Sequence, residues 1–193
     1  KKYGRVVQVG QQQRSGKHWK AAMDFIRSGR LGKIRRINIW ANFNYGAGRE
    51  KVPDSPVPEG VDFDMWLGPA PRAPYCPARL PYQWRWVRDY SGGQLTDWGA
   101  HQIDTAQLAN DTERTGPVSV EGHGQRHTDG LYDTYYDYHL VYHYANGVEM
   151  RVDSGGTGLR FEGTDGWVGN VSFGEALRAS SEEIRNSQIG PDE

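Results

Sequence analysis

Hydrophobic residues recur along this chain with two different periods, and the period changes near Gly116. A β-branched run at 5–10 that ends in glycine predicts a strand. The next segment predicts a helix, because its apolar residues have helical spacing, at Trp19, Ala22, Met23 and Ile26. Ser15 can cap this helix, and Gly29 or Gly32 can end it in the left-handed conformation that glycine adopts freely.

Alternation of apolar and polar residues predicts a strand at 33–45 and dominates the last third of the chain. That last third contains three alternating runs, at 117–127, 134–152 and 159–173. The turn sequences Asn146-Gly147 and Asp165-Gly166 favour the positive backbone angles of tight hairpins. Together these patterns predict a meandering antiparallel sheet.

Prolines interrupt almost every possible element between Gly46 and Tyr82, at positions 53, 56, 58, 69, 71, 74, 77 and 81. They leave room for one short helix at 62–68. We expect an ordered loop here, because several large apolar side chains would be costly to leave in water: Phe63, Trp66, Leu67 and Tyr75. A further helix is predicted at 93–109.

These elements predict an α+β fold, with a predominantly antiparallel open sheet and helices on one face. An N-terminal strand and helix at 1–32 precede the main part of the fold at 33–175. The second part carries a Pro- and Trp-rich insertion at 46–90, and residues 176–193 form a polar tail.

Charge and composition narrow the class of partner. The 193 residues include 23 Lys and Arg against 24 Asp and Glu, so no overall field attracts nucleic acid or an anionic membrane. No apolar run approaches the roughly 20 residues of a membrane span. The single cysteine, Cys76, excludes an internal disulfide framework. We expect a small neutral molecule or another protein as the partner, and neither nucleic acid nor membrane.

The stretch "SGGQLTDWGAHQIDTAQ" at 91–107 carries the candidate chemistry. Asp97, His101 and Asp104 stand at i, i+4 and i+7, which places them in one stripe of a helix where all three could point into one cleft. Histidine titrates near neutrality and a carboxylate one turn away can orient it, which favours acid–base chemistry. Two other interpretations stay open: a metal site, which needs further ligands, and a buried histidine held by a carboxylate for structural reasons.

Two other motifs are weaker. "GQQQRSGKH" fails as a phosphate loop, because five residues separate Gly10 from Gly16 and His18 replaces the Ser or Thr that holds magnesium. No G-x-G-x-x-G follows a strand, so the dinucleotide fingerprint is missing from this sequence. His139 and His143 share one strand face but lie about 13 Å apart, too far to share a metal directly.

The sequence "GGQLTDWGAHQID" resembles the G-G-x-x-x-D-x-G-x-H-x-x-D signature of the Gfo/Idh/MocA family, the glucose–fructose oxidoreductase and inositol dehydrogenase group. "RVVQVGQQQRSGKHWKAAMDFIRSGRLGKI" resembles the last strand of that family's Rossmann domain and the helix leading into its second domain. "DFDMWLGPAPRAPY…WRWVRDYSGG" is similar to a bacterial subgroup with long Trp- and Pro-rich insertions. The resemblance covers most of residues 3 to 175. It implies that residues 1–32 are a remnant of the dinucleotide-binding domain with its crossover helix, and that residues 33–175 form an α/β substrate and dimerisation domain.

The resemblance implies an NAD(P)-dependent oxidoreductase that acts on a sugar or cyclitol. His101 matches the active-site histidine, Asp97 the acidic residue one turn before it, and Arg14 the arginine after the last Rossmann strand. The family's glycine-rich cofactor loop and its E-K-P motif have no counterpart here, and "REKVP" at 49–53 lies in the wrong place. We therefore expect NAD or NADP in the full-length family and none bound by this chain alone.

The predicted substrate pocket combines the 93–109 helix with Arg14, Asp104 and two tryptophans, Trp84 and Trp86, which could stack on a sugar ring or belong to the core. Two alternatives stay open. One is a non-redox sugar-binding or interaction module. The other is a cofactor-free lyase or hydrolase that uses His101 and Asp97.

A row of aromatic residues in the run 134–152 predicts a homo-oligomer through the sheet. One face of this strand carries Tyr136, Tyr138, Leu140, Tyr142 and Tyr144. We expect too few helices to cover both sheet faces, so a second copy should cover this one. The alternative is that the tyrosine hydroxyls keep the face solvated.

Overall fold

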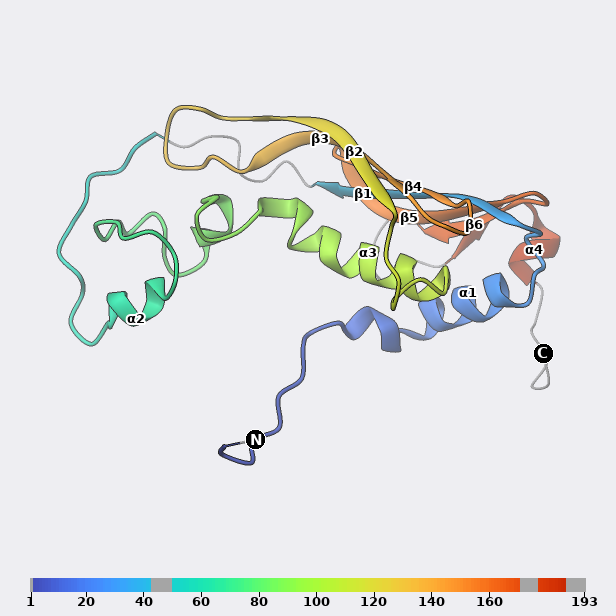
Figure 1. Cartoon of the computed structure of the whole chain (residues 1–193), viewed down its shortest axis with the longest axis horizontal. Helices are drawn as coiled ribbons and strands as arrows, with labels where there is room; N and C mark the ends of the chain where they lie inside the picture. The colour runs from blue at the N-terminus through green and yellow to red at the C-terminus, as the bar shows by residue number, and fades with distance from the viewer. Residues whose placement is uncertain (1, 43–49, 171–176, 187–193) are drawn as a thin grey trace.

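The computed structural model describes residues 2–42, 50–170 and 177–186 (Figure 1). Four α-helices lie in these residues: α1 (Lys17–Arg27), α2 (Phe63–Leu67), α3 (Trp98–Ala109) and α4 (Glu182–Asn186). Three 3₁₀ helices are η1 (Gln12–Ser15), η2 (Gln83–Trp86) and η3 (Gly93–Leu95). The strands are β1 (Ile34–Asn42), β2 (Ser119–Arg126), β3 (Tyr135–His143), β4 (Glu149–Asp153), β5 (Gly156–Gly163), β6 (Trp167–Asn170) and β7 (Arg178–Ala179). None of the helices in these ranges is long and apolar enough to cross a membrane.

The strands form one open sheet in the order β2-β3-β4-β1-β5-β6-β7. Neighbouring strands are antiparallel except β1 and β4, which are parallel. The predicted hairpins are confirmed at both turns: Tyr144 and Val148 close the one between β3 and β4, and Gly163 and Gly166 the one between β5 and β6. The sheet is therefore predominantly antiparallel, as expected, but β1 interrupts the meander by inserting between β4 and β5.

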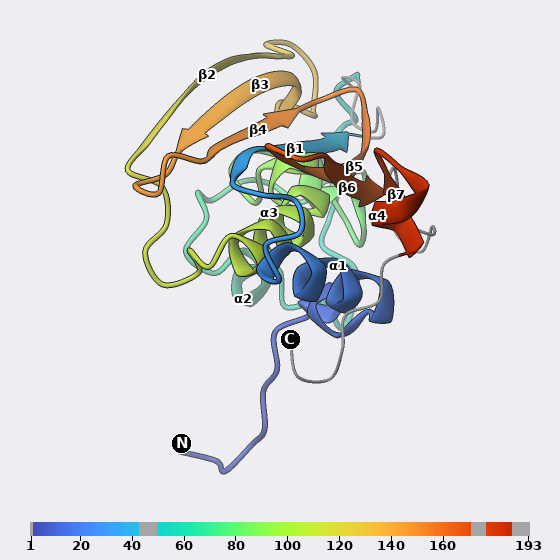
Figure 2. The same cartoon turned by 90° about the vertical axis from the view of Figure 1, so that its right-hand side faces the viewer.

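Helices α1 and α3 cover one face of the sheet, and none of the helices in the described ranges lies on the other face (Figures 1 and 2). Alternate residues of β1 point into this layer, and Ile37, Ile39 and Ala41 are fully buried there. Helix α1 contributes an apolar face that includes Trp19, which is 1% exposed. The α+β class with helices on one face is confirmed.

The tyrosine face of β3 is the face that the helices cover. Tyr138 and Tyr144 are each 4% exposed, and Leu140 and Tyr142 pack against the same core. The Tyr138 hydroxyl donates a hydrogen bond to the Ala41 carbonyl on β1. The prediction that this face needs a second copy as cover is therefore wrong, because its side chains already belong to the main core on the helix side of the sheet.

The uncovered face of the sheet carries charged residues that pair both across strands and within a strand. Arg36 on β1 lies between Glu149 on β4 and Glu162 on β5, with N–O distances of 3.4 and 3.8 Å. Arg151 donates to Glu149 at 2.6 Å, and Arg160 pairs with Glu162. Burial disfavours the charged form of Glu149, but the hydrogen bond from Arg151 and the charges of Arg151 and Arg36 outweigh it and lower the pKa of Glu149.

The predicted strand at 5–10 is wrong. This segment forms no strand, and Val6, Val7 and Val9 are 97%, 88% and 76% exposed. Figure 1 shows it running away from the body of the molecule. A strand needs a neighbour for its backbone hydrogen bonds, and the sheet order of the described residues contains no strand that pairs with it.

The insertion forms a lobe beyond the N-terminal end of α3, as Figure 1 shows. It contains the predicted short helix as α2, which Asp62 caps by accepting a hydrogen bond from the Met65 backbone at 2.9 Å. A small separate core joins the lobe to the segment that precedes β3. Trp86, Val87 and Tyr132 are buried in it, and Tyr90 and Leu131 pack on them. The described part of the insertion, from residue 50, is thus an ordered structure, as expected.

Candidate functional site

The backbone enters α3 through a turn that requires glycine. Gly93 has a φ of +67°, and a Cβ placed on it would lie 2.7 Å from the Thr134 side-chain oxygen. Thr134 is buried just before β3. The close approach of this turn to the start of β3 explains the second glycine of the "SGGQ" sequence and fixes where the next residues begin the helix.

Asp97 lies at the N-cap of α3, one residue before the helix, but its side chain makes no capping hydrogen bond. Arg85 in η2 donates instead from Nη1 to Asp97 Oδ2 at 2.6 Å. The Arg85 guanidinium also lies 3.8 Å from the centre of the Tyr82 ring. The side chains of Arg85 and Asp97 are only 18% and 30% exposed, so the insertion holds this carboxylate in a defined position.

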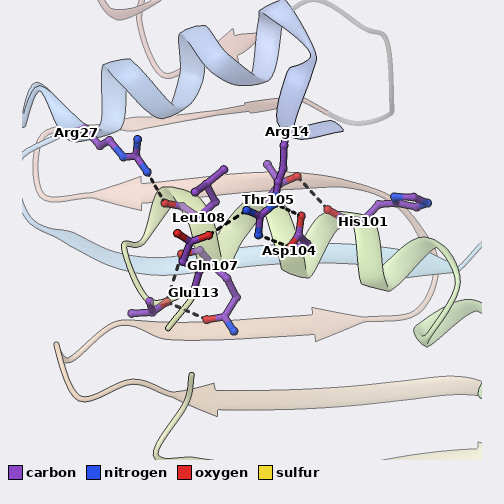
Figure 3. A network of polar contacts seen from close by, with 9 residues as sticks. Arg14, Arg27, His101, Asp104, Thr105, Gln107, Leu108 and Glu113 are labelled. Atoms are coloured by element: carbon purple, nitrogen blue, oxygen red, sulfur yellow. Dashed lines mark hydrogen bonds and ion pairs between the residues drawn. The ribbon is translucent and has the colours of Figure 1, made fainter. Parts of the chain in front are cut away.

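His101 lies one turn further along α3 and is half-buried. The Thr105 hydroxyl donates to its backbone carbonyl at 2.9 Å, and the imidazole points away from Asp104 (Figure 3). The predicted stripe is therefore divided between two places. Asp97 and His101 lie toward the N-terminal end of the helix, whereas Asp104 turns toward η1.

Arg14 and Asp104, both predicted to touch substrate, bind each other. Arg14 donates from Nε and Nη2 to the two Asp104 oxygens at 2.6 and 2.5 Å, and from Nη1 to Glu113 at 3.0 Å (Figure 3). These bonds, that with Asp104 above all, raise the pKa of Arg14 despite the opposing effect of burial. Arg27 on α1 adds a bond to the Leu108 carbonyl at 2.8 Å. The Arg14–Asp104 pair thus fastens η1 to α3, and the Arg27 hydrogen bond fastens α1 to the same helix.

The two predicted stacking tryptophans have different environments. Trp86 is 4% exposed, belongs to the small core of the insertion and donates from Nε1 to Gln83 at 2.8 Å. It cannot present a ring face to a sugar, so the prediction of a stacking role for Trp86 is wrong. Trp84 is half-buried and lines a pocket of about 490 Å³. The other residues of the pocket are Trp66, Leu67, Pro69, Ala70, Pro71, Asp89 and Tyr90.

Sequence reasoning missed Arg85, Trp66 and Tyr90 as residues around this site. The pattern "WRW" placed a cation between two aromatics, but nothing local indicated that Arg85 reaches a carboxylate twelve positions later. Trp66 and Tyr90 lie 24 positions apart and meet only through the fold of the insertion. Long-range contacts of this kind leave no periodic signal.

The described residues do not fit a dinucleotide or suggest a metal. Their only parallel strand pair is β1 with β4, and the connection between the two contains α2, α3, β2 and β3 instead of the single crossover helix of a dinucleotide-binding unit. Within residues 2–42, 50–170 and 177–186, no group of three His, Cys, Asp or Glu side chains could hold a metal ion.

A family model described as "Oxidoreductase family, C-terminal alpha/beta domain" matches residues 19–173. The chain therefore belongs to the Gfo/Idh/MocA oxidoreductases and contains their C-terminal α/β domain. No curated protein matches the sequence.

Solved structures of oxidoreductases have the same fold. The aldose-aldose oxidoreductase of Caulobacter crescentus, complexed with glycerol, is 20% identical with a TM-score of 0.62, and the match covers 93% of this chain and 46% of that one. The WlbA dehydrogenase of Bordetella pertussis, in complex with NADH and UDP-GlcNAcA, is 13% identical with a TM-score of 0.57 over 95% and 50% of the two chains. A putative NADPH-dependent oxidoreductase of Desulfitobacterium hafniense is 15% identical with a TM-score of 0.59 over 87% and 40%. This chain spans half or less of their lengths.

Proposed function

We propose that this chain is the substrate-binding part of an NAD(P)-dependent oxidoreductase that acts on a sugar or a cyclitol. One observation carries the proposal: Arg85 holds Asp97 at the start of α3, one turn before His101, inside the region that the family model matches. The glycerol bound to the Caulobacter protein and the nucleotide sugar bound to the Bordetella protein support a polyhydroxyl substrate.

Oxidation of an alcohol needs a group that removes the hydroxyl proton. We assign this role to His101, because imidazole exchanges protons near neutral pH. Asp97, held by Arg85, would accept a hydrogen bond from a neighbouring substrate hydroxyl and orient the ring. In this family NAD or NADP takes up the hydride. The part that we assign to the described residues is to bind the substrate and to move the proton.

Turnover of the protein expressed from its complete reading frame tests this assignment. NAD(P)H formation is followed with a panel of aldoses, disaccharides and cyclitols. His101→Ala should lower kcat by about 100-fold or more, the usual contribution of a positioned acid–base group. His127 lies outside α3, so His127→Ala is the matched control and should retain activity. Equal activity of the His101 variant and the wild type would contradict the assignment.

Cofactor binding by the present chain gives a second check. We expect titration with NADH or NADPH, followed by fluorescence, to show no micromolar affinity, because the described residues build no dinucleotide crevice. Micromolar binding would contradict this expectation.

A non-redox sugar-binding module is the second candidate, and the aromatic pocket beside Trp84 favours it. The two candidates differ in one measurable respect. A sugar-binding module would bind the same saccharides but show no NAD(P)-linked turnover from the complete reading frame.

A further inference from the structure

The pocket of the insertion includes neither His101 nor Asp97, and η2 connects it to the candidate active site. We propose that it binds a second sugar ring, so that the substrate is a disaccharide or another glycoside rather than a free monosaccharide. The inference rests on the proposed function, because it assumes that the reacting ring is bound at His101.

The aromatic walls of the pocket are held in place by their neighbours. Trp66 stacks on Phe63 with ring centres 5.7 Å apart and planes 14° apart. Tyr90 meets Trp66 edge to face at 5.1 Å, and Arg79 donates to the Tyr90 hydroxyl at 3.4 Å. Trp66 nevertheless stays 37% exposed. Exposure of a fixed indole to water is unfavourable. Trp66, with the rings of Trp84 and Tyr90 in the same pocket, is therefore suited to bind an apolar ligand face.

Asp89 is the charged residue of the pocket lining, and it is exposed. Its carboxylate can accept two or more hydrogen bonds from hydroxyl groups. Pro69 and Pro71 complete an otherwise apolar lining. The pocket therefore combines flat apolar faces with an acceptor at one side, which matches the C–H face and the hydroxyl rim of a pyranose ring.

One short element connects this pocket to the candidate active site. Trp84 and Arg85 are consecutive in η2, where Trp84 lines the pocket and Arg85 binds Asp97. Consecutive Cα atoms are 3.8 Å apart, so η2 contributes neighbouring residues to both binding places. A ligand of two linked rings could contact both, whereas a single ring could contact only one.

Binding affinity of the present chain for saccharides tests this proposal without any cofactor. Glucose is compared with maltose and cellobiose by calorimetry. We expect at least one disaccharide to bind about tenfold more tightly than glucose, the contribution expected from one stacked ring. Trp84→Ala should reduce this ratio to near one, and Tyr135→Ala, an exposed aromatic outside the pocket, should leave it unchanged.

The exposed Asp89 provides a second variant that does not depend on packing. Asp89→Asn should lower the disaccharide preference several-fold while the thermal unfolding of the protein stays the same. Equal affinity for glucose and both disaccharides would overturn the proposal. An aromatic cage with a carboxylate could instead select a quaternary ammonium cation, so tight binding of tetramethylammonium would also overturn it. A disaccharide preference without NAD(P)-linked turnover would refute the proposed function alone, whereas turnover without the preference would refute the second-ring site alone.

Discussion

Arg85 and Asp97 form an ion pair that joins the insertion to the start of α3, with a nitrogen–oxygen distance of 2.6 Å. If this pair orients Asp97 for substrate, its loss should lower turnover without unfolding the protein. We expect Arg85→Ala to reduce kcat/KM by about tenfold, the value of one lost charged hydrogen bond. Arg85→Lys should recover part of the loss. Full activity of Arg85→Ala would show that Asp97 needs no such positioning.

The bond between Arg14 and Asp104 should stabilise the fold, because it fastens η1 to α3 from 90 positions away. The Arg14 side chain is 36% exposed, so we expect Arg14→Ala to lower the free energy of unfolding by only about 1 kcal/mol. Urea denaturation of both single variants and of Arg14→Ala with Asp104→Asn measures the coupling. Arg5→Ala, in the exposed N-terminal segment, is the control and should have no effect.

Gly93 should be the least replaceable glycine at the candidate site. Gly93→Ala combines a positive φ with a clash against Thr134, and we expect a loss of about 2–3 kcal/mol of unfolding free energy. Gly147→Ala is the matched control, since its φ is +83° but no atom lies within 4 Å of the added Cβ. It should cost only about 1 kcal/mol. A similar loss for both variants would show that the contact with Thr134 is unimportant.

The buried tyrosines should make the fold sensitive to alkali. Burial above all, and then the charges of Tyr142 and Asp153, raise the pKa of Tyr138 above its ordinary value of 10.0. Burial and the Tyr142 charge raise the pKa of Tyr144 to about 12. The unfolded chain therefore loses these protons first, so stability is complete below about pH 10 and falls as the pH rises toward the folded-state values.

Tyr138→Phe tests this directly. The variant should lose about 1 kcal/mol at neutral pH, because the hydrogen bond to the Ala41 carbonyl is lost. Its stability should then decline less than that of the wild type between neutrality and about pH 11. Tyr135→Phe, which is exposed, should follow the wild-type curve. Parallel curves for Tyr138→Phe and the wild type would contradict the prediction.

The face of the sheet that α1 and α3 leave uncovered, and not the tyrosine row, leads us to predict a dimer. Trp40 and Trp167 flank Arg160 there, with ring centres 6.0 and 5.3 Å from its guanidinium carbon. A two-fold axis brings the same surface of two copies together, and a surface with paired charges and two tryptophans can be complementary to its own copy. Light scattering should give about twice the 21.8 kDa of one chain, and Trp167→Glu should shift it toward the monomer. A wild-type mass near 21.8 kDa would exclude the dimer.

Local signals in the sequence were enough to place most elements. Gly29 follows the end of α1, and Asn146-Gly147 forms the turn between β3 and β4, because both depend on a few residues whose backbone preferences are strong. The motif around His101 likewise indicated the helix and the family.

Only the tertiary structure decided which face of β3 is covered, where β1 enters the sheet, and which partners the predicted site residues have. Alternation divides a strand into two faces but does not say which face meets a helix. For this reason the sequence predicts a second copy over the tyrosine row, whereas in the structure the row faces the protein's own core. The strand predicted at 5–10 does not form, because a strand also needs a neighbouring strand to pair with, and the β propensity of its own residues cannot supply one. Arg14 and Asp104 lie 90 positions apart, and Arg85 and Asp97 lie 12 positions apart in different elements. Both contacts depend on packing that no local pattern of residues encodes.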